Sequence, residues 1–245
     1  RLLPAAGRNR IADWWLKIRM SYRKTSATRV VRAYEEKYEL LSQQLQEHCI
    51  TMAELQLFLR AFKAEQVLEV WVKASEDRGL QLLLEYPFCQ TSGQPGPKRR
   101  EGDKQIPEGI YHINRFNPES KFYLSLGLNY PNASDRILGD PERPGRDIFI
   151  HGGCNTVGCI PITDDKIREL YVLAVEAKQN GQAEIPVLIF PCRMTAEKLA
   201  AIVRQYPEHE QFWNDLKIIF DKFEGSQALP AIEITADGRY SLTRS

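Results

Sequence analysis

A histidine and a cysteine eight residues apart are the side chains of this sequence best suited to act together in a reaction. His151 follows the apolar run 148–150, and Cys159 follows Gly158 directly. An imidazole beside a thiol can take its proton, and the thiolate that results is a strong nucleophile. The pair therefore predicts acyl transfer through a thioester, with Cys159 as the nucleophile and His151 as the base.

Glycines shape the same stretch on both sides of the cysteine. Gly152 and Gly153 predict a turn after the histidine, and Gly158 leaves the backbone around the sulfur accessible. Two backbone N–H groups aimed at one point can stabilise the oxyanion that forms when a thiolate attacks a carbonyl. We expect this oxyanion hole to use the amide of Cys159 and that of Gly158 or Val157.

This stretch resembles the active-site signature of the L,D-transpeptidase family, whose catalytic domain is of the YkuD type. The residues that carry the resemblance are His151-Gly152 and Thr156-Val157-Gly158-Cys159. Cys154 and Thr163-Asp164 also resemble the YafK-like branch of that family. Pro161 stands where many transpeptidases carry an arginine that contacts the substrate.

The resemblance implies a substrate and a location. It implies attack on peptidoglycan stem peptides at the L-centre carbonyl of diaminopimelate, with no cofactor and no metal. In the YafK-like branch it points to hydrolysis that releases an amino acid or a wall-linked lipoprotein, as an alternative to transpeptidation. It also implies that the Gly152 carbonyl orients the imidazole of His151. The expected location is the periplasm or cell envelope, reached through a signal or anchor outside this sequence.

Two polar loops are expected near the site, and they supply the remaining candidate substrate contacts. Residues 91–107 carry Lys104 among several cations that could meet substrate carboxylates, and residues 130–145 begin with Tyr130. Together with Thr156 of the signature, Lys104 and Tyr130 are the predicted substrate-binding residues.

Hydrophobic periodicity predicts an α+β protein. We expect an N-terminal helical segment (1–64), a mainly β catalytic domain (65–195), and C-terminal helices with a final strand packed on that domain (196–245). Thr51 and Glu54 form a capping box that predicts a second N-terminal helix over 55–62. Alternation over 68–86 predicts a β-hairpin, and Thr163 and Thr195 are expected to cap helices.

Charge and hydropathy exclude some classes of partner. The 33 Lys and Arg against 32 Asp and Glu leave a net charge of +1, which gives no general attraction to nucleic acid. No apolar run approaches the roughly 18 residues of a membrane-spanning helix. Near the N-terminus, Ile11, Trp14, Trp15 and Ile18 form one apolar helical face in a basic segment. That face predicts either peripheral membrane contact or packing on the body of the protein.

The five cysteines leave two other hypotheses open. His151, Cys154 and Cys159 with Cys192 or Cys89 could bind zinc in a catalytically silent or wall-binding module. A Cys154–Cys159 disulfide would likewise exclude catalysis. In the catalytic hypothesis, proximity to His151 is expected to depress the pKa of the Cys159 thiol, and Cys89 is expected to be structural.

Overall fold

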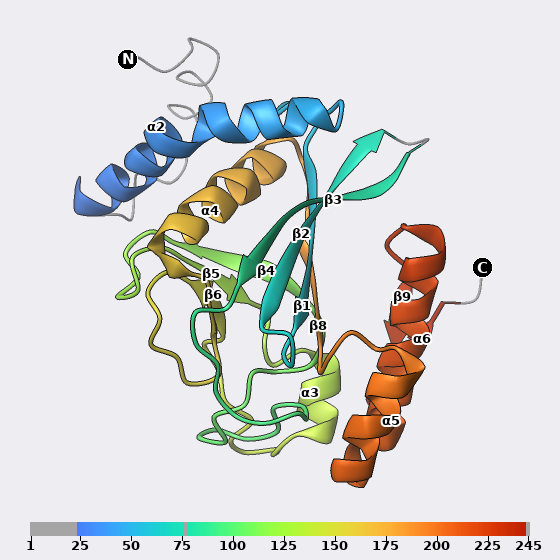
Figure 1. The fold of residues 1–245 in the computed structure, drawn as a ribbon. Helices are drawn as coiled ribbons and strands as arrows, with labels where there is room; N and C mark the ends of the chain where they lie inside the picture. Colours follow the sequence, from blue (N-terminus) through green and yellow to red (C-terminus); the bar gives the residue numbers. More distant parts are fainter. Residues whose placement is uncertain (1–23, 76–77, 244–245) are drawn as a thin grey trace.

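One large, mostly antiparallel sheet organises the protein. The computed structural model describes residues 24–75 and 78–243. Its eight strands lie in the order β3-β2-β1-β8-β4-β5-β6-β7, and β9 and β10 form a separate hairpin. Helices cover both faces of the sheet, with α2 and α4 on one side and α5 and α6 on the other (Figure 1). The predicted α+β class with flanking helices is confirmed.

The strands and helices have the following bounds. The strands are β1 (Gln56–Phe62), β2 (Val67–Ser75), β3 (Arg78–Pro87), β4 (Gly109–Asn117), β5 (Ser125–Leu128), β6 (Phe149–His151), β7 (Ile160–Pro161), β8 (Pro186–Phe190), β9 (Ile232–Ile234) and β10 (Tyr240–Leu242). The helices are α2 (Lys24–Glu47), α3 (Ala133–Leu138), α4 (Thr163–Gln179), α5 (Ala196–Gln205), the 3-10 turn η1 (Pro207–His209) and α6 (Glu210–Ser226).

The helix predicted over 55–62 is wrong, because this stretch is strand β1. Thr51 Oγ1 does donate to Glu54 Oε2 at 2.7 Å, but the pair closes a short turn instead of starting a helix. β1 is paired along both edges, with β2 and β8, and each of its two faces is buried in a hydrophobic core. A strand buried on both faces is continuously apolar, and its spacing then cannot be distinguished from that of a buried helix.

Alternate side chains of β1 enter two different hydrophobic cores. Leu57, Leu59 and Ala61 pack in the core beneath α2 and α4. Phe58 and Phe62 point the other way, into a core that contains Trp213 and other apolar residues of α6. The period-2 alternation of a strand thus places β1 at the centre of the molecule, although the sequence assigned it to the N-terminal segment.

Helix α2 is fixed to helix α4 by two polar contacts. Tyr34 Oη donates to Glu176 Oε1 at 2.8 Å, and Lys37 Nζ lies 2.9 Å from Glu169 Oε1. Within the predicted N-terminal helical segment, α2 is a helix of 24 residues. The 68–86 hairpin is confirmed, as is the Thr195 cap, whose side chain accepts from Lys198 N. The apolar face predicted over 11–18 lies outside the described residues.

Two local predictions need correction. The loop predicted over 130–145 contains the short helix α3, which the Asn132 side chain caps by accepting from Asp135 N at 2.9 Å. Helix α4 is assigned from Thr163, which puts Ile162 at the cap position; Thr163 has a φ of 71°, and its Oγ1 still accepts from Lys166 N at 3.4 Å, as the predicted cap requires. Both differences arise from backbone conformations that apolar periodicity does not report.

A buried ion pair anchors the long loop before β4 to the sheet. Lys63 Nζ donates to the Gly96 and Ile106 carbonyls at 2.8 and 2.9 Å and to Glu108 Oε1 at 2.8 Å. The other carboxylate oxygen, Glu108 Oε2, accepts from Trp213 Nε1 at 2.7 Å. One carboxylate thereby joins the loop, the sheet and helix α6.

We expect Glu108→Ala to lower the free energy of unfolding by about 3–5 kcal/mol, because it leaves the Lys63 ammonium and the Trp213 N–H buried without a partner. Urea denaturation followed by tryptophan fluorescence measures this change. Glu101→Ala is the matched control, since Glu101 pairs with Arg143 on the surface. Equal unfolding midpoints for the two variants would contradict the anchoring role.

Candidate active site

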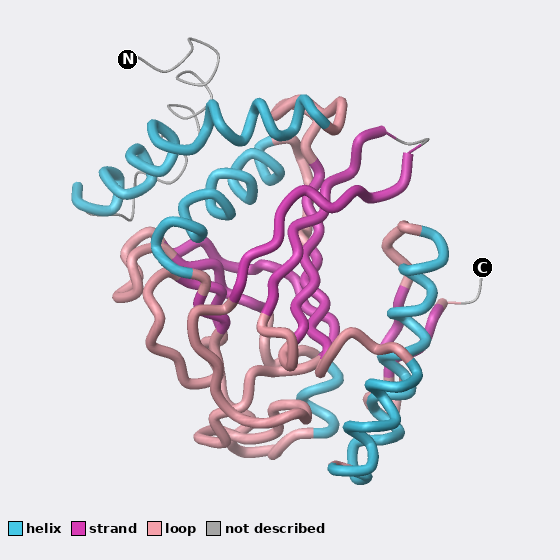
Figure 2. The backbone as a smooth tube through the Cα atoms, in the orientation of Figure 1, coloured by secondary structure: helices cyan, strands magenta, loops and turns pink. Residues whose placement is uncertain are grey.

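Parallel pairing of β6 with β7 brings His151 and Cys159 to one site. His151 is the last residue of β6, Cys159 directly precedes β7, and Ile150 pairs with Ile160 in register. The two side chains line the same cavity of about 340 Å³. Loops gather at this end of the sheet (Figure 2). The arrangement therefore places an imidazole and a thiol at the wall of one open cavity.

The imidazole of His151 is oriented by its own turn. His151 is 1% exposed, and its Nδ1 lies 2.5 Å from the Gly152 carbonyl oxygen. A carbonyl only accepts, so Nδ1 carries the proton and Nε2 is left as the basic nitrogen. Nε2 is buried and has no hydrogen-bond partner in the described part of the chain. Burial lowers the pKa of His151, which keeps the ring neutral.

The thiol of Cys159 lies against the backbone of the strand that carries the histidine. Its Sγ accepts from the Phe149 N–H at 3.4 Å and lies 3.7 Å from the Asp147 carbonyl oxygen. Burial raises the pKa of Cys159, and the Phe149 N–H offsets this only partly. The predicted depression of this pKa is therefore wrong for the free protein, because desolvation of the thiolate outweighs the polar contacts around it.

The two amides expected to hold an oxyanion already donate to hydroxyl groups. Cys159 N donates to Thr156 Oγ1 at 3.0 Å, and Gly158 N donates to Ser92 Oγ at 2.7 Å. Gly158 has a φ of 87°, and a Cβ there would lie 2.9 Å from the Gln105 carbonyl oxygen. The backbone is thus tight against the 91–107 loop, and only glycine fits at this position.

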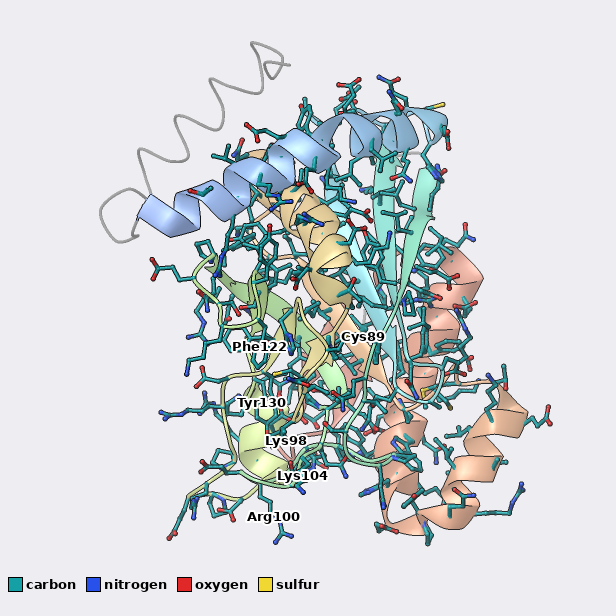
Figure 3. The ribbon with its side chains drawn as sticks, turned by 60° about the vertical axis from the view of Figure 1, so that its left-hand side comes forward. Cys89, Lys98, Arg100, Lys104, Phe122 and Tyr130 are labelled. Carbon is teal, nitrogen blue, oxygen red and sulfur yellow. A yellow bond between two sulfur atoms is a disulfide. The ribbon has the colours of Figure 1, made fainter. Side chains whose placement is uncertain are left out.

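The predicted substrate-binding residues do not lie together. Thr156 lines the cavity, and its hydroxyl also donates to the Cys159 carbonyl at 2.8 Å. Tyr130 is buried and donates to the Pro144 carbonyl at 2.7 Å. Lys104 is exposed, in the loops at the bottom of the view in Figure 3, below Phe122 and Cys89. Neither Lys104 nor Tyr130 lines the cavity that contains Cys159.

The remaining wall of the cavity comes from residues that the sequence did not single out. Val157, proposed only for its amide, contributes a side chain that is 69% exposed at the rim. The other lining residues are Gln90, Phe122 and Asn155. All of them are uncharged, and no pattern in a single sequence distinguishes them from ordinary loop residues.

A disulfide holds the loop between the histidine and the cysteine. Cys154 is bonded to Cys89, with the Cα atoms 5.4 Å apart, and Cys159 is free. The predicted Cys154–Cys159 disulfide is therefore wrong. The zinc hypothesis is wrong too, because the Cys89 and Cys154 sulfurs are bonded to each other. The described residues contain no cluster of three or more His, Cys, Asp or Glu side chains suited to a metal.

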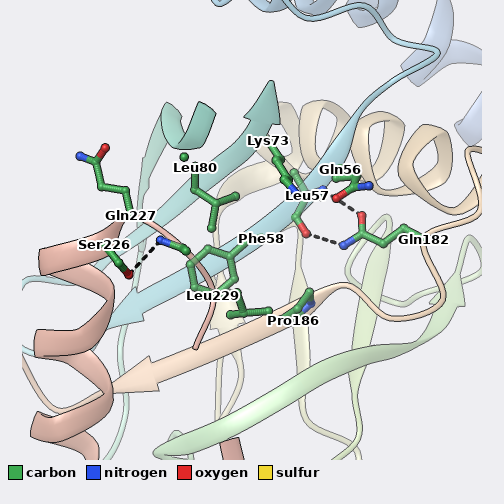
Figure 4. A pocket seen from close by; sticks show the side chains of 12 residues that line it. Gln56, Leu57, Phe58, Lys73, Leu80, Gln182, Pro186, Ser226, Gln227 and Leu229 are labelled. Atoms are coloured by element: carbon green, nitrogen blue, oxygen red, sulfur yellow. Dashed lines mark hydrogen bonds between the residues drawn. The ribbon is translucent and has the colours of Figure 1, made fainter. Parts of the chain in front are cut away.

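A second cavity, of about 460 Å³, lies between the start of β1 and the end of α6 (Figure 4). Leu57, Leu80 and Leu229 form its apolar part, and Lys73 lies at its polar side. It contains no histidine or cysteine, so the paired nucleophile and base distinguish the smaller cavity as the candidate active site.

None of the helices in the described residues is both long enough and apolar enough to cross a membrane.

We expect Cys159 to react slowly with iodoacetamide at pH 7, and its rate to keep rising with pH beyond the ordinary thiol pKa of about 8.5, because its raised pKa leaves little thiolate. Peptide mass spectrometry against pH gives the rate at each site. Cys49, an exposed free thiol in the same chain, is the internal control. Faster modification of Cys159 than of Cys49 at pH 6 would instead mean a preformed thiolate.

Comparisons with known proteins show the family of this chain. Residues 60–189 match the model of the YkuD family, described as the L,D-transpeptidase catalytic domain. The chain is 34% identical over 190 residues to the putative L,D-transpeptidase YafK of Escherichia coli strain K12, covering 77% of this chain and 74% of the relative. The same values hold for YafK of Escherichia coli O157:H7.

Among solved structures, the helical cell shape determining protein Pgp2 of Campylobacter jejuni aligns with a TM-score of 0.44 and 19% identity, over 74% of this chain and 73% of that one. The L,D-transpeptidase 1 of Mycobacterium tuberculosis aligns with a TM-score of 0.32 and 14% identity, over 55% of this chain and 62% of that one. Because both the family model and the YafK relative match its sequence, the chain belongs to the L,D-transpeptidase family with a YkuD-type catalytic domain.

Proposed function

We propose that this protein is a cysteine acyltransferase that acts on peptidoglycan stem peptides at the L-centre carbonyl of diaminopimelate. Membership of the L,D-transpeptidase family supports the substrate class. The observation that carries the chemistry is the shared cavity of a free Cys159 thiol and a His151 imidazole whose Nε2 is buried without a partner. A general base and a free thiol that line the same cavity are the minimum machinery for thioester formation.

The first half-reaction forms an acyl-enzyme. Cys159 Sγ attacks the carbonyl carbon while its proton passes to His151 Nε2, giving a tetrahedral oxyanion. The oxyanion collapses, the bond to the leaving amine breaks, and the proton on Nε2 passes to that amine. The products of this step are a free amine and a Cys159 thioester. The Gly152 carbonyl keeps Nδ1 protonated throughout, so no acidic third residue is needed.

The oxyanion needs donors that the free protein uses elsewhere. We expect the Cys159 and Gly158 N–H groups to exchange the hydroxyls of Thr156 and Ser92 for the substrate oxygen. Neutral hydroxyls are weaker acceptors than an oxyanion, so the exchange favours the transition state over the free enzyme. Between turnovers, the two hydroxyls then accept the hydrogen bonds of these N–H groups and hold the backbone in place.

The second half-reaction decides between transfer and hydrolysis. An amine of another stem peptide that attacks the thioester gives transpeptidation, whereas water gives an amidase. In both cases His151 Nε2 takes the proton of the incoming nucleophile and returns it to the Cys159 sulfur. The wall-linked lipoprotein expected for the YafK-like branch would be a leaving group of the hydrolytic reaction.

A location in the cell envelope fits the chemistry of the cysteines. The Cys89–Cys154 disulfide needs an oxidising compartment to persist, and peptidoglycan lies in such a compartment. We therefore infer that the protein works in the periplasm or at the envelope.

We expect Cys159→Ala and His151→Gln to lower turnover by a factor of roughly 10⁴ or more, since the nucleophile and its base act as one unit. The assay is incubation with purified muropeptides, with and without a protein-linked diaminopimelate, and identification of the products by mass. Crosslinked or exchanged products mean transpeptidation, and a freed peptide or protein remnant means hydrolysis.

Cys49→Ala is the matched control, because it removes a free thiol remote in sequence from the cavity and should leave turnover unchanged. Full activity of Cys159→Ala, or no product from the wild-type protein with either substrate, would refute the proposed function.

A further inference from the structure

An aromatic ring covers the proposed base. The ring of Phe122 stacks on the imidazole of His151 with centroids 4.4 Å apart and an interplanar angle of 28°. Phe122 is 41% exposed, whereas His151 beneath it is 1% exposed. A large apolar side chain gains little by remaining at the surface, so this placement needs a specific support and suggests a specific role.

The backbone around Phe122 packs on the same corner. Gly152 N donates to the Leu124 carbonyl at 3.1 Å. A Cβ on Gly152 would lie 2.8 Å from the Phe122 carbonyl oxygen, so this glycine admits the segment that carries the ring. The turn is shaped locally by Phe122 N donating to Ser120 Oγ at 3.1 Å and by a φ of 71° at Tyr123.

Arg29 of helix α2 holds this turn. Arg29 Nη1 donates to the Ser120 carbonyl at 2.8 Å and to the Tyr123 carbonyl at 2.7 Å, one on each side of Phe122. The Arg29 guanidinium also lies over the Tyr123 ring, 5.5 Å from its centroid. Charge-assisted bonds to two carbonyls three residues apart fix the path of the chain between them.

We propose that Phe122 is a positioning residue for His151, and that helix α2 sets Phe122 in place through Arg29. The ring holds the imidazole plane by stacking and excludes water from it, so that Nε2 stays a neutral acceptor in the site that His151 shares with Cys159. The N-terminal helix thereby gains a part in the site without contacting substrate. The expected effect of Phe122 on turnover rests on the proposed function, whereas its expected effect on the titration of His151 does not.

Few charged groups face the imidazole, so removal of the ring should dominate its titration. From α4, Asp164 Oδ1 accepts from Gly153 N at 2.7 Å beside the turn. Cys159 shares the cavity, and β5 presents the uncharged Ser125 opposite His151. Lys121, next to Phe122 in the turn, is exposed. Burial is accordingly the main influence on the pKa of His151, and it lowers that pKa.

The first test is an NMR titration of the His151 Cε1–H, assigned by its absence in His151→Gln. We expect Phe122→Ala to move the His151 pKa upward, toward the ordinary value of about 6.5, since water then reaches the ring. Arg29→Met, which removes the donors but keeps an apolar stem, should shift it in the same direction. Arg32→Met is the matched control, because Arg32 lies on the same helix and its exposed side chain forms an ion pair with Glu36.

The second test is turnover of muropeptides against pH. We expect Phe122→Ala to lower kcat at pH 7 roughly tenfold with little change in KM, which is the loss expected when a base is misplaced by a fraction of an ångström. The acidic limb of the pH profile should also move to higher pH, because the pKa of His151 rises. Ile218→Ala is the control, because it shortens an exposed apolar side chain far away on α6, and it should change neither kcat nor the pH profile. The double variant Arg29→Met/Phe122→Ala should be no slower than Phe122→Ala alone, because the arginine acts through the ring.

The outcomes separate the two proposals. An unchanged His151 pKa in Phe122→Ala, or effects of Arg29→Met and Phe122→Ala that multiply, would overturn the positioning role. A shifted His151 pKa in a protein that turns over no muropeptide would uphold the positioning role and refute the peptidoglycan function. Thermal melting of each variant checks that it is folded, and the NMR shift in Phe122→Ala alone decides the matter if Arg29→Met does not fold.

Discussion

The short parallel pairing of β6 with β7 is the constraint on which the site depends. Only two residue pairs form it, Ile150 with Ile160 and His151 with Pro161. The Ile162 N–H extends it by donating to the His151 carbonyl at 3.0 Å. The Pro161 carbonyl faces outward and accepts from Cys89 N at 3.0 Å, which continues the contact toward β3. Since proline has no N–H, this position suits the edge of a sheet.

So short a pairing needs support from outside the sheet. The loop between His151 and Cys159 is held by the Cys89–Cys154 disulfide and by the bond from Gly158 N to Ser92 Oγ. Both supports come from the segment that follows β3, whose far end is anchored by the Lys63–Glu108 pair. Buried ionic groups of this kind fix one arrangement in place, because every alternative leaves a charge unpaired. The site is thus stabilised by residues distant in sequence.

The sequence predicted what local chemistry determines. His151, Cys159 and the glycines between them were identified because residue type and spacing alone suggest a nucleophile, a base and a turn. The hairpin of β2 with β3 and the Thr195 cap followed from alternation and capping. β1 was predicted wrongly because coverage of both its faces is a tertiary fact, and the partner of Cys154 was missed because Cys89 lies 65 residues away. Arg29 and Phe122 gave no signal, since their roles exist only in contacts between distant segments.

The electrostatics of the free site favour a neutral thiol and a neutral imidazole over a thiolate–imidazolium pair. Burial raises the pKa of Cys159 and lowers that of His151, so each shift opposes charge separation before substrate arrives. In the proposed reaction, proton transfer then belongs to the attack itself, when the developing oxyanion and its N–H donors offset the cost of the imidazolium. The same neutrality protects the nucleophile, because thiol–disulfide exchange proceeds through the thiolate. In the proposed function, a free thiol can therefore persist in an oxidising compartment alongside the exposed Cys89–Cys154 disulfide and still become reactive when a carbonyl binds beside it.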